Sequence, residues 1–297
     1  MNVWWDQRNS ICFSGAETRS VAGASEFHFN DYPESFLVRK WGAGFVRRQI
    51  RGLASFEALA RRASSEAIYG EIPALTQVRD KSVLIVLAGP STDQVAWERL
   101  DVDFIWSCNR FYQHPKLRRL PLALVGLAPN IPLRGNTGLE AYLGDTRQTA
   151  VFFELQKVHD FAARDGMHYF VRRHSTRCTY VHLRYASYLG LGSRLICLAA
   201  LLGARDIYFV GFDGMSEAGP RHTFEPGKSN PTWYVRNGAD VQRRQIVIFW
   251  DYILSLTRPA GVRLHNLAEA AESNPGAVIA GMQFPLSASL LQAVAPT

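Results

Sequence analysis

The sequence has few cysteines, and they are not placed for a metal site or a disulfide framework. Four cysteines are scattered over 297 residues, and no two of them form a Cys-x-x-Cys pair. This spacing excludes a zinc ribbon and a redox dithiol, and it suits a reducing cytoplasm. The histidines show no ligand spacing either, so we predict no bound metal and no cofactor.

Long hydrophobic runs are also lacking. No stretch of about 18 apolar residues is free of charge, so we expect no transmembrane helix. The first ten residues, MNVWWDQRNS, lack the basic region and apolar core of a signal peptide. We therefore expect a cytoplasmic protein, either free or peripheral on the inner face of the membrane.

Several common catalytic and binding motifs are absent. There is no Gly-x-Gly-x-x-Gly fingerprint, and the only Gly-Lys-Ser, at 227–229, has His222 where a phosphate-binding P-loop has its first glycine. There is no Gly-x-Ser-x-Gly nucleophile elbow and no zinc-finger or RNA-motif signature. These absences argue against NAD binding, a P-loop and an α/β-hydrolase, and we predict no nucleic-acid partner.

What the chain does have is a large apolar fraction and a positive charge. Hydrophobic residues make up 47% of it, enough for a sizeable core, and the formal net charge is +7. A basic protein is biased towards anionic partners such as nucleotides or an acidic membrane face. A basic surface kept only for solubility explains the charge equally well.

The sequence divides into two regions. Residues 1–80 show no alternation of strands and helices, and within them residues 35–62 interleave basic and aromatic side chains. We interpret 1–80 as an N-terminal extension that packs on the main domain, with peripheral contact with an anionic membrane as the alternative. We assign 81–297 to one nucleotide-binding catalytic domain.

Short apolar runs and helical segments alternate from Lys81 onward. We expect strands near 82–88, 103–107, 120–125, 150–155, 167–171, 206–211 and 261–265, and helices at 178–202, with a break at the glycines near 190, and 240–255. This order predicts an α/β, Rossmann-like fold with a mainly parallel sheet and helices on both faces.

The candidate site residues follow the predicted strands, because ligands bind at the carboxyl ends of parallel strands. The first group is Gly89, Pro90 and Ser91, which resemble a phosphate-binding turn and equally a plain tight turn. The second is Asn109 with Arg110, where the amide suits a ribose hydroxyl or base edge and equally a helix cap.

Two further groups come late in the chain. Gly211, Asp213 and Gly214 form a glycine-flanked acidic turn, which is either a functional carboxylate or a structural turn. His222 follows in a polar loop, and its ordinary pKa suits general-base catalysis near neutral pH. A basic run (Arg172, Arg173, His174, Arg177, His182 and Arg184) suits phosphate oxygens or a solvated helix face.

Three blocks together resemble a known family. They are 83–91 (VLIVLAGPS), 107–112 (SCNRFY) and 201–213 (LLGARDIYFVGFD), and their order is similar to that in bacterial sialyltransferases of the Campylobacter capsule and lipooligosaccharide type. They also resemble a wider group that includes motility accessory factors and a methanogen pterin diphosphokinase. The resemblance covers roughly 81–267, with gaps.

The resemblance implies a metal-independent, inverting transfer from a CMP-linked, sialic-acid-like sugar to a glycan or glycolipid acceptor at the bacterial surface. It implies that the loop 89–91 cradles the phosphate, that Asn109 contacts the cytidine nucleotide, and that Gly192, Ser193 and Arg194 contact the donor. We expect His222 as the base, with Arg221 and Arg194 stabilising the departing phosphate.

The chain departs from the family at the expected catalytic positions. The two tyrosines that the family places after the Gly-x-Asp turn correspond to Met215 and Arg221, and the position of the family histidine corresponds to 235–237, where there is none. Two other functions therefore stay open. One is a magnesium-dependent diphosphokinase using Asp213 and Asp93, and the other is an inactive nucleotide-binding scaffold.

Overall fold

A computed structural model describes residues 10–13, 77–154, 167–174, 177–183, 189–213, 222–228, 246, 249–250, 253–254, 257–258 and 260–268. The chain forms two compact units. The first is Met1–Gln77 with Pro121–Ala186, and the second is Val78–Leu120 with Ser187–Thr297. Each unit contributes its own set of hydrogen-bonded strands.

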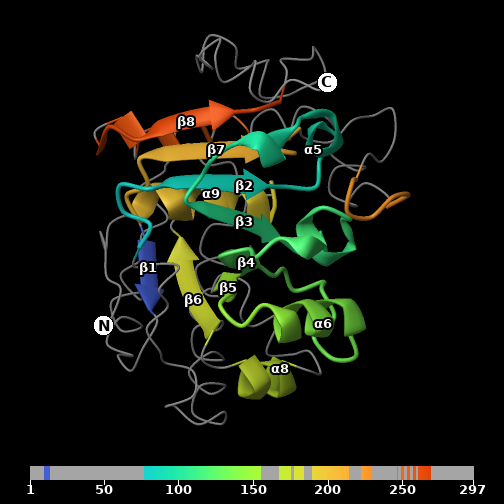
Figure 1. The fold of residues 1–297 in the computed structure, drawn as a ribbon. Coiled ribbons are helices and arrows are strands. Elements are labelled where there is room, and N and C mark those ends of the chain that lie inside the picture. Colours follow the sequence, from blue (N-terminus) through green and yellow to red (C-terminus); the bar gives the residue numbers. More distant parts are fainter. Residues whose placement is uncertain are drawn as a thin grey trace. The chain divides into compact units, whose positions relative to one another are not determined.

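The second unit is built on four parallel strands in the order β3-β2-β7-β8, drawn side by side in Figure 1. Their bounds are β2 Ser82–Val86, β3 Phe104–Cys108, β7 Asp206–Val210 and β8 Arg263–Asn266. Residues 83–86 of β2 are fully buried. A short, continuous β-branched and apolar run of this kind is typical of a central parallel strand.

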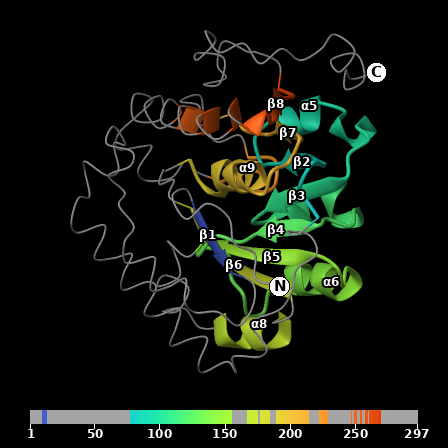
Figure 2. The same ribbon diagram turned by 90° about the vertical axis from the view of Figure 1, so that its left-hand side faces the viewer.

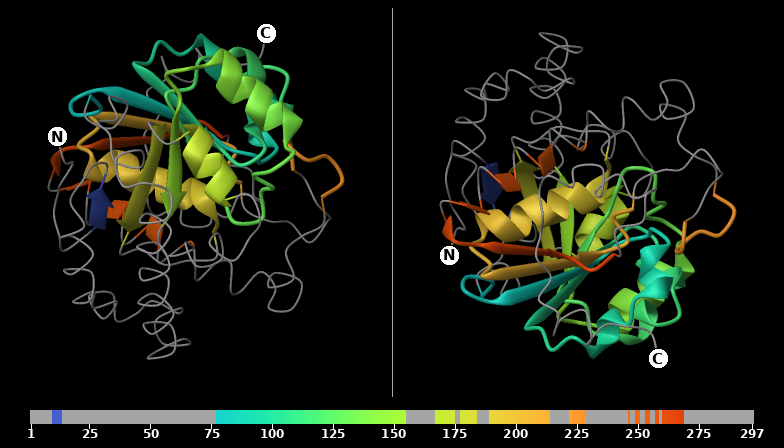
Figure 3. Two further views of the ribbon diagram at one scale, coloured as in Figure 1. Left: turned by 90° about the horizontal axis from the view of Figure 1, so that it is seen from below. Right: turned by 90° about the horizontal axis from the view of Figure 1, so that it is seen from above.

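Helix α9 (Leu191–Leu201) covers one face of these strands and contacts β2, β3 and β7 (Figures 2 and 3). Its residues 191–200 are all buried. The helix begins after Gly190, which has a φ of 82°, and Gly203, with a φ of 79°, follows its C-cap Leu202. Both values are in the left-handed region that favours glycine. Among the described residues, this unit also holds the short elements α5 Ser91–Gln94, η2 Trp97–Arg99, η3 Phe111–Gln113 and η4 Leu117–Arg119. The described residues 246, 249–250, 253–254, 257–258 and 260 are helical as well.

The first unit holds strands in the order β1-β6-β5-β4. The pairs β4–β5 and β5–β6 are parallel, and β1 pairs antiparallel with β6. The strands are β1 Ser10–Phe13, β4 Leu124–Gly126, β5 Ala150–Glu154 and β6 Cys178–Leu183, with helices α6 Thr137–Asp145 and α8 Met167–His174. The predicted α/β, Rossmann-like class with a mainly parallel sheet is thus confirmed.

Two predicted elements were wrong. Residues 167–171 form the start of helix α8 and not a strand: Phe170 and His174 are buried one turn apart, while Tyr169 and Arg173, also one turn apart, are exposed. The predicted helix 178–202 begins with strand β6, and among the described residues of this range the helix is α9. The β-branched and aromatic run Thr179-Tyr180-Val181 favours a strand.

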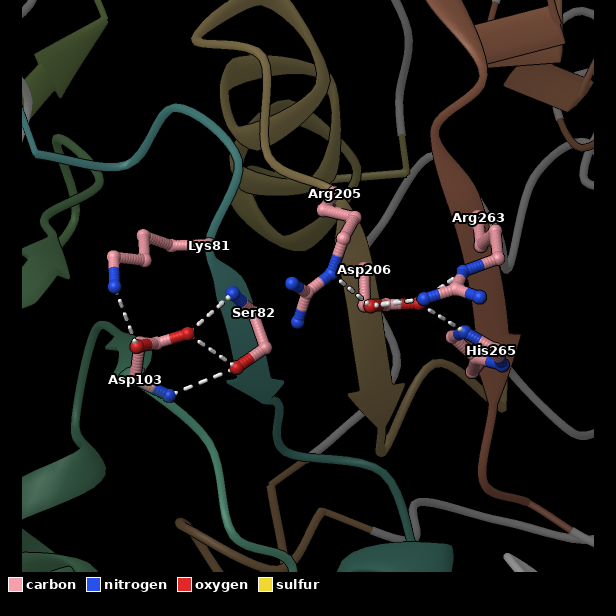
Figure 4. A network of polar contacts seen from close by, with 7 residues as sticks. All are labelled: Lys81, Ser82, Asp103, Arg205, Asp206, Arg263 and His265. Carbon is pink, nitrogen blue, oxygen red and sulfur yellow. Dashed lines mark hydrogen bonds and ion pairs between the residues drawn. The ribbon is translucent and has the colours of Figure 1, made fainter.

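Two sets of polar contacts lie at the amino ends of the strands in the second unit (Figure 4). One joins Asp103, just before β3, to Ser82 of β2, and the other joins β7 to β8. The Asp206 carboxylate, which is almost fully buried, accepts two hydrogen bonds from Arg263 at 2.6 and 2.7 Å, one from Arg205 at 2.9 Å, and contacts His265 Nε2 at 3.0 Å. Burial raises the pKa of Asp206, but these hydrogen bonds outweigh it and hold the pKa well below its ordinary value.

We expect Asp206→Asn to lower the free energy of unfolding by about 2–3 kcal/mol, because a neutral amide cannot replace a buried carboxylate with three basic partners. Urea unfolding at neutral pH measures the change. Asp145→Asn is the control, because Asp145 is exposed in the last turn of α6, where an acid is slightly unfavourable. Equal unfolding midpoints for Asp206→Asn and wild type would show that the contacts of Asp206 contribute nothing.

Candidate functional site

The candidate residues gather at the carboxyl ends of β3, β2 and β7, within the second unit. Strand β2 pairs with β3 on one side and with β7 on the other. The chain thus continues from β2 to one neighbour first and later returns to its other side. Such a topological switch point is where ligands bind in open parallel sheets.

The loop after β2 is closed by contacts to the loop after β7. Gly89 N–H donates to the Gly211 carbonyl at 2.9 Å, and Ser91 N–H donates to Asp213 Oδ2 at 2.8 Å. The Ser91 hydroxyl in turn accepts the Gly211 N–H at 2.8 Å. These reciprocal bonds fix the two loops against each other.

Gly89 and Gly211 are needed for this close approach. A Cβ at Gly89 would lie 2.2 Å from Asp213 Oδ2 and 2.6 Å from the Gly211 carbonyl oxygen. Gly211 has a φ of 77°, and a Cβ there would lie 2.4 Å from Thr92 Oγ1. The Thr92 hydroxyl donates to the Leu87 carbonyl at 2.6 Å, which leaves no room beside it.

The backbone amides of this loop are already bonded within the protein. Besides Gly89 and Ser91, Thr92 N–H donates to the Gly89 carbonyl and Asp93 N–H to the Pro90 carbonyl, at 3.1 and 3.0 Å. The loop can therefore present a rigid surface to a ligand, but its N–H groups are not available as hydrogen-bond donors. Charge for an anionic ligand has to come from side chains nearby.

Asp213 holds the loop through its carboxylate. Burial raises the pKa of Asp213, and the hydrogen bonds from Ser91 offset only part of that rise. Since Oδ2 accepts the Ser91 N–H, this contact assigns Asp213 a positioning function. Its predicted catalytic role stays a prediction.

Asn109 and Arg110 follow β3 directly. Asn109 has a φ of 56°, the left-handed conformation that asparagine tolerates better than most residues. The turn places the half-buried Arg110 for an ion pair of 2.7 Å between its Nε and Glu225 Oε1. Cys108, just before them, is buried, and burial raises the pKa of its thiol to about 12, so this cysteine is not a nucleophile at neutral pH.

The segment 222–228 attaches to the same edge. Thr223 N–H donates to the Ala88 carbonyl at 2.8 Å, and its hydroxyl donates to the Gly89 carbonyl at 3.1 Å. Phe224 is buried and packs its ring near those of His114 and His222. The segment therefore brings His222 beside the loop after β2, as the predicted site requires.

His222 is neutral at physiological pH. Burial lowers its pKa, Lys228 and Arg110 lower it further, and Glu225 only partly offsets them, so the pKa is about 4. Its Nδ1 accepts the Glu225 N–H at 3.1 Å, which places the proton of the neutral ring on Nε2. To act as a base, His222 must accept a proton on Nδ1, and the hydrogen bond from the Glu225 N–H to Nδ1 is then lost.

The lowered pKa predicts a pH-dependent stability. Between pH 6.5 and 4 the unfolded chain binds a proton at His222 that the folded chain does not, so stability is complete above pH 6.5 and falls as the pH drops towards 4. We expect a loss of about 1–2 kcal/mol, because solvent partly screens the ring. Urea unfolding at pH 7.5 and pH 5 measures it.

His222→Asn should flatten this pH dependence, since the asparagine oxygen still accepts the Glu225 N–H but does not titrate. His174→Asn is the comparison, because burial lowers the pKa of His174 as well. If wild type and His222→Asn lose the same stability between pH 7.5 and 5, the neutral buried ring is not responsible.

The amino end of α9 reaches the end of β2. A Cβ at Gly192 would lie 2.4 Å from Leu87 Cδ1, so this glycine allows the close contact. The Ser193 hydroxyl and the Arg194 guanidinium both donate to the Gly190 carbonyl, at 3.0 and 2.9 Å. Ser193 and Arg194 are buried, and their predicted contacts with the donor stay predictions.

Some predicted residues lie outside the described part of the chain. They are Gly214, Arg221, Arg184 and the segment 35–62. Of the basic run, Arg177 donates to the carbonyls of Leu143 and Thr146 and so ends helix α6. Sequence reasoning missed Thr223, Glu225 and Lys228 as parts of the site, and the only signal for them was the polar run around His222.

The described residues form neither a metal cluster nor a membrane-spanning helix. Among these residues, no three His, Cys, Asp or Glu side chains lie together in a way that could hold a metal ion. The sequence has an Asp-x-Asp pair at Asp101 and Asp103, but it precedes β3 at the amino edge, where Asp103 bonds Ser82. In this part of the chain, no helix has the length and apolar character needed to cross a bilayer.

No family model and no curated protein matches the sequence. Among solved structures, the sialyltransferase CstII from Campylobacter jejuni, in complex with the substrate analogue cytidine-5'-monophosphate, is similar at 16% identity and a TM-score of 0.43, over 70% of this chain and 86% of that one. The monofunctional α-2,3-sialyltransferase Cst-I from the same organism is similar at 15% identity and a TM-score of 0.43, over 71% and 81%. Similarity at this level establishes no activity for this chain.

Proposed function

We propose that the chain is a glycosyltransferase that binds a CMP-linked acidic sugar at the carboxyl edge of β3, β2 and β7. The observation that carries the proposal is the rigid loop Gly89–Ser91 at the switch point of the strands, to which Thr223 attaches the segment 222–228. In that segment Glu225 binds the cations of Arg110 and Lys228. The three sequence blocks that resemble sialyltransferases contain this loop, Asn109 and Asp213. Anionic nucleotide sugars suit a rigid loop flanked by cations.

The described residues at this edge of the sheet are assigned the following roles. The loop after β2 forms the rigid surface against which the nucleotide binds, and Asp213 holds that loop in place. Asn109 is assigned to the nucleotide through its side-chain amide, which both donates and accepts. Arg110 and Lys228 neutralise the leaving phosphate as negative charge develops on it.

His222 is assigned to the acceptor, as the base that removes the proton of the attacking sugar hydroxyl. Its low pKa keeps the ring unprotonated at neutral pH, which a base requires. Arg221 is proposed as a further cation at the phosphate. A glycan or glycolipid acceptor, and contact of residues 35–62 with an anionic membrane, belong to the same proposal.

The proposed transfer needs no metal. Of the two carboxylates that a diphosphokinase would use, Asp213 accepts the Ser91 N–H and Asp93 lies 3.2 Å from His114 Nε2. No observation on these residues favours magnesium binding, so the kinase alternative becomes an outcome of the test.

A donor assay tests the proposed function. Purified protein is incubated with CMP-sialic acid, UDP-glucose or ATP plus magnesium, and nucleotide release is followed by chromatography. We expect CMP release from CMP-sialic acid in the presence of EDTA and none from UDP-glucose. Turnover of ATP alone, and only with magnesium, would assign the chain to the diphosphokinases, whereas inactivity with tight CMP binding would indicate a scaffold.

A further inference from the structure

Glu225 bridges the two cations of the proposed site. Its Oε1 lies 2.7 Å from Arg110 Nε, and its Oε2 contacts Lys228 Nζ. The carboxylate is mostly buried, with 17% of the side chain exposed, and Oε2 also lies 3.7 Å from His222 Nε2. A carboxylate between an arginine and a lysine has the arrangement that these side chains adopt around an anionic ligand.

The cluster remains positive despite this carboxylate. Two cations face one anion, and the ring of His222 beside them is neutral. The positive charge affects two neighbouring groups. Lys228 and Arg110 contribute to lowering the pKa of His222, and Lys228 offsets a small part of the rise that burial causes in the pKa of the Cys108 thiol. An additional or replacing anion is therefore favoured at this place.

The side chain of Glu225 can rotate away from Arg110 and Lys228 without unfolding the segment 222–228. It begins the turn 225–228, in which Lys228 N–H donates to the Glu225 carbonyl at 3.0 Å. Pro226 and Gly227 are exposed, and no heavy atom lies within 4 Å of a Cβ built on Gly227. Rotation about the side-chain bonds of Glu225 exposes Arg110 and Lys228 while Thr223 and Phe224 keep the segment attached.

We propose that the Glu225 carboxylate is an internal substitute for an anionic group of the ligand, and that ligand binding displaces it from Arg110 and Lys228. The identity of this ligand as a nucleotide sugar rests on the proposed function. The anion is either the phosphate or the sugar carboxylate of the donor, which share the same chemistry towards these cations. Glu225 thus lowers the affinity for anions and shields the cations when the site is empty.

Calorimetric titration of Glu225→Gln tests the proposal. We expect the variant to bind CMP about 5–10-fold more tightly than wild type, since the ligand no longer competes with a carboxylate. Cytidine, which lacks the phosphate, should bind both proteins equally. Arg110→Gln should weaken CMP binding at least about tenfold.

Glu98→Gln is the matched control, because it removes the same charge from an ion pair with Lys116 in the same unit. It should leave CMP affinity within about twofold of wild type, a difference of about 0.4 kcal/mol. Glu225→Asp is a second variant, in case the glutamine variant does not fold. It keeps the charge but is too short to bridge both cations, so we expect an intermediate gain in affinity.

Titrations with different ligands show which anion displaces Glu225. They also test the displacement of Glu225 separately from the proposed function. A gain with CMP identifies the phosphate, whereas a gain confined to CMP-sialic acid identifies the sugar carboxylate. Inorganic pyrophosphate is a probe that needs no nucleotide site. If pyrophosphate binds more tightly to Glu225→Gln while CMP binds to neither protein, Glu225 is a competitor but the proposed function fails. Unchanged or weaker binding of every anion by Glu225→Gln would overturn the inference.

Discussion

Gly89→Ala is expected to abolish tight nucleotide binding and to destabilise the protein. The added methyl group meets Asp213 Oδ2 at 2.2 Å and the Gly211 carbonyl oxygen at 2.6 Å, and one of these is backbone. The loops after β2 and β7 must separate, which breaks the Ser91–Asp213 contact. We expect a loss of about 2 kcal/mol in unfolding free energy and at least a tenfold loss of CMP affinity, equivalent to about 1.4 kcal/mol.

Gly144→Ala is the matched control for this substitution. Gly144 lies within α6, and no heavy atom is within 4 Å of a Cβ built there. Alanine is the better helix former, so this variant should be as stable as wild type or more stable by up to about 1 kcal/mol. Wild-type CMP affinity in Gly89→Ala would mean that the closed loop is not part of the nucleotide site.

His222→Asn and His222→Ala are expected to lower turnover by about 100-fold, with CMP affinity changed by less than about threefold, if His222 is the base. Asparagine preserves an acceptor for the Glu225 N–H, whereas alanine does not. Both variants lose the titrating ring, so a catalytic role predicts that both fail equally. A role limited to holding the segment 222–228 predicts that asparagine restores activity.

The pH profile gives a second readout for His222. With a pKa of about 4 in the free protein, kcat/KM should stay level from about pH 7 down to pH 5 and fall only near pH 4. A histidine base with an ordinary pKa would give a fall near pH 6.5 instead. Full activity in His222→Asn would remove His222 from the chemistry.

The fold was largely predictable where local sequence and tertiary context agree. Strands β2 and β7 are continuous runs of β-branched and apolar residues, and both were predicted within two residues at each end. Residues 167–171 have strand-like composition, but the one-turn pairing of Phe170 with His174 stabilises a helix there. Strand β6 was missed because 178–202 was interpreted as helical throughout, although the run Thr179-Tyr180-Val181 at its start favours a strand.

The site was predictable in its position but not in its contacts. Turn residues after predicted strands indicated Gly89, Ser91, Gly211 and Asp213, and the structure brings the four together because parallel strands end at the same edge of a sheet. Sequence could not show that the loop amides are bonded internally, nor that Arg110 meets Glu225. The contacts of Gly89 with Gly211, of Ser91 with Asp213 and of Arg110 with Glu225 join residues more than 100 positions apart. Only the folded arrangement of β2, β3 and β7 brings them together.

Calorimetric titration of the wild-type protein with CMP in the presence of EDTA is the most direct test of a nucleotide site at the carboxyl edge of β3, β2 and β7. We expect CMP to bind at one site per chain without magnesium, and Arg110→Gln to weaken this binding at least about tenfold. No heat from CMP, together with magnesium-dependent binding of ATP, would show that this edge serves a different chemistry.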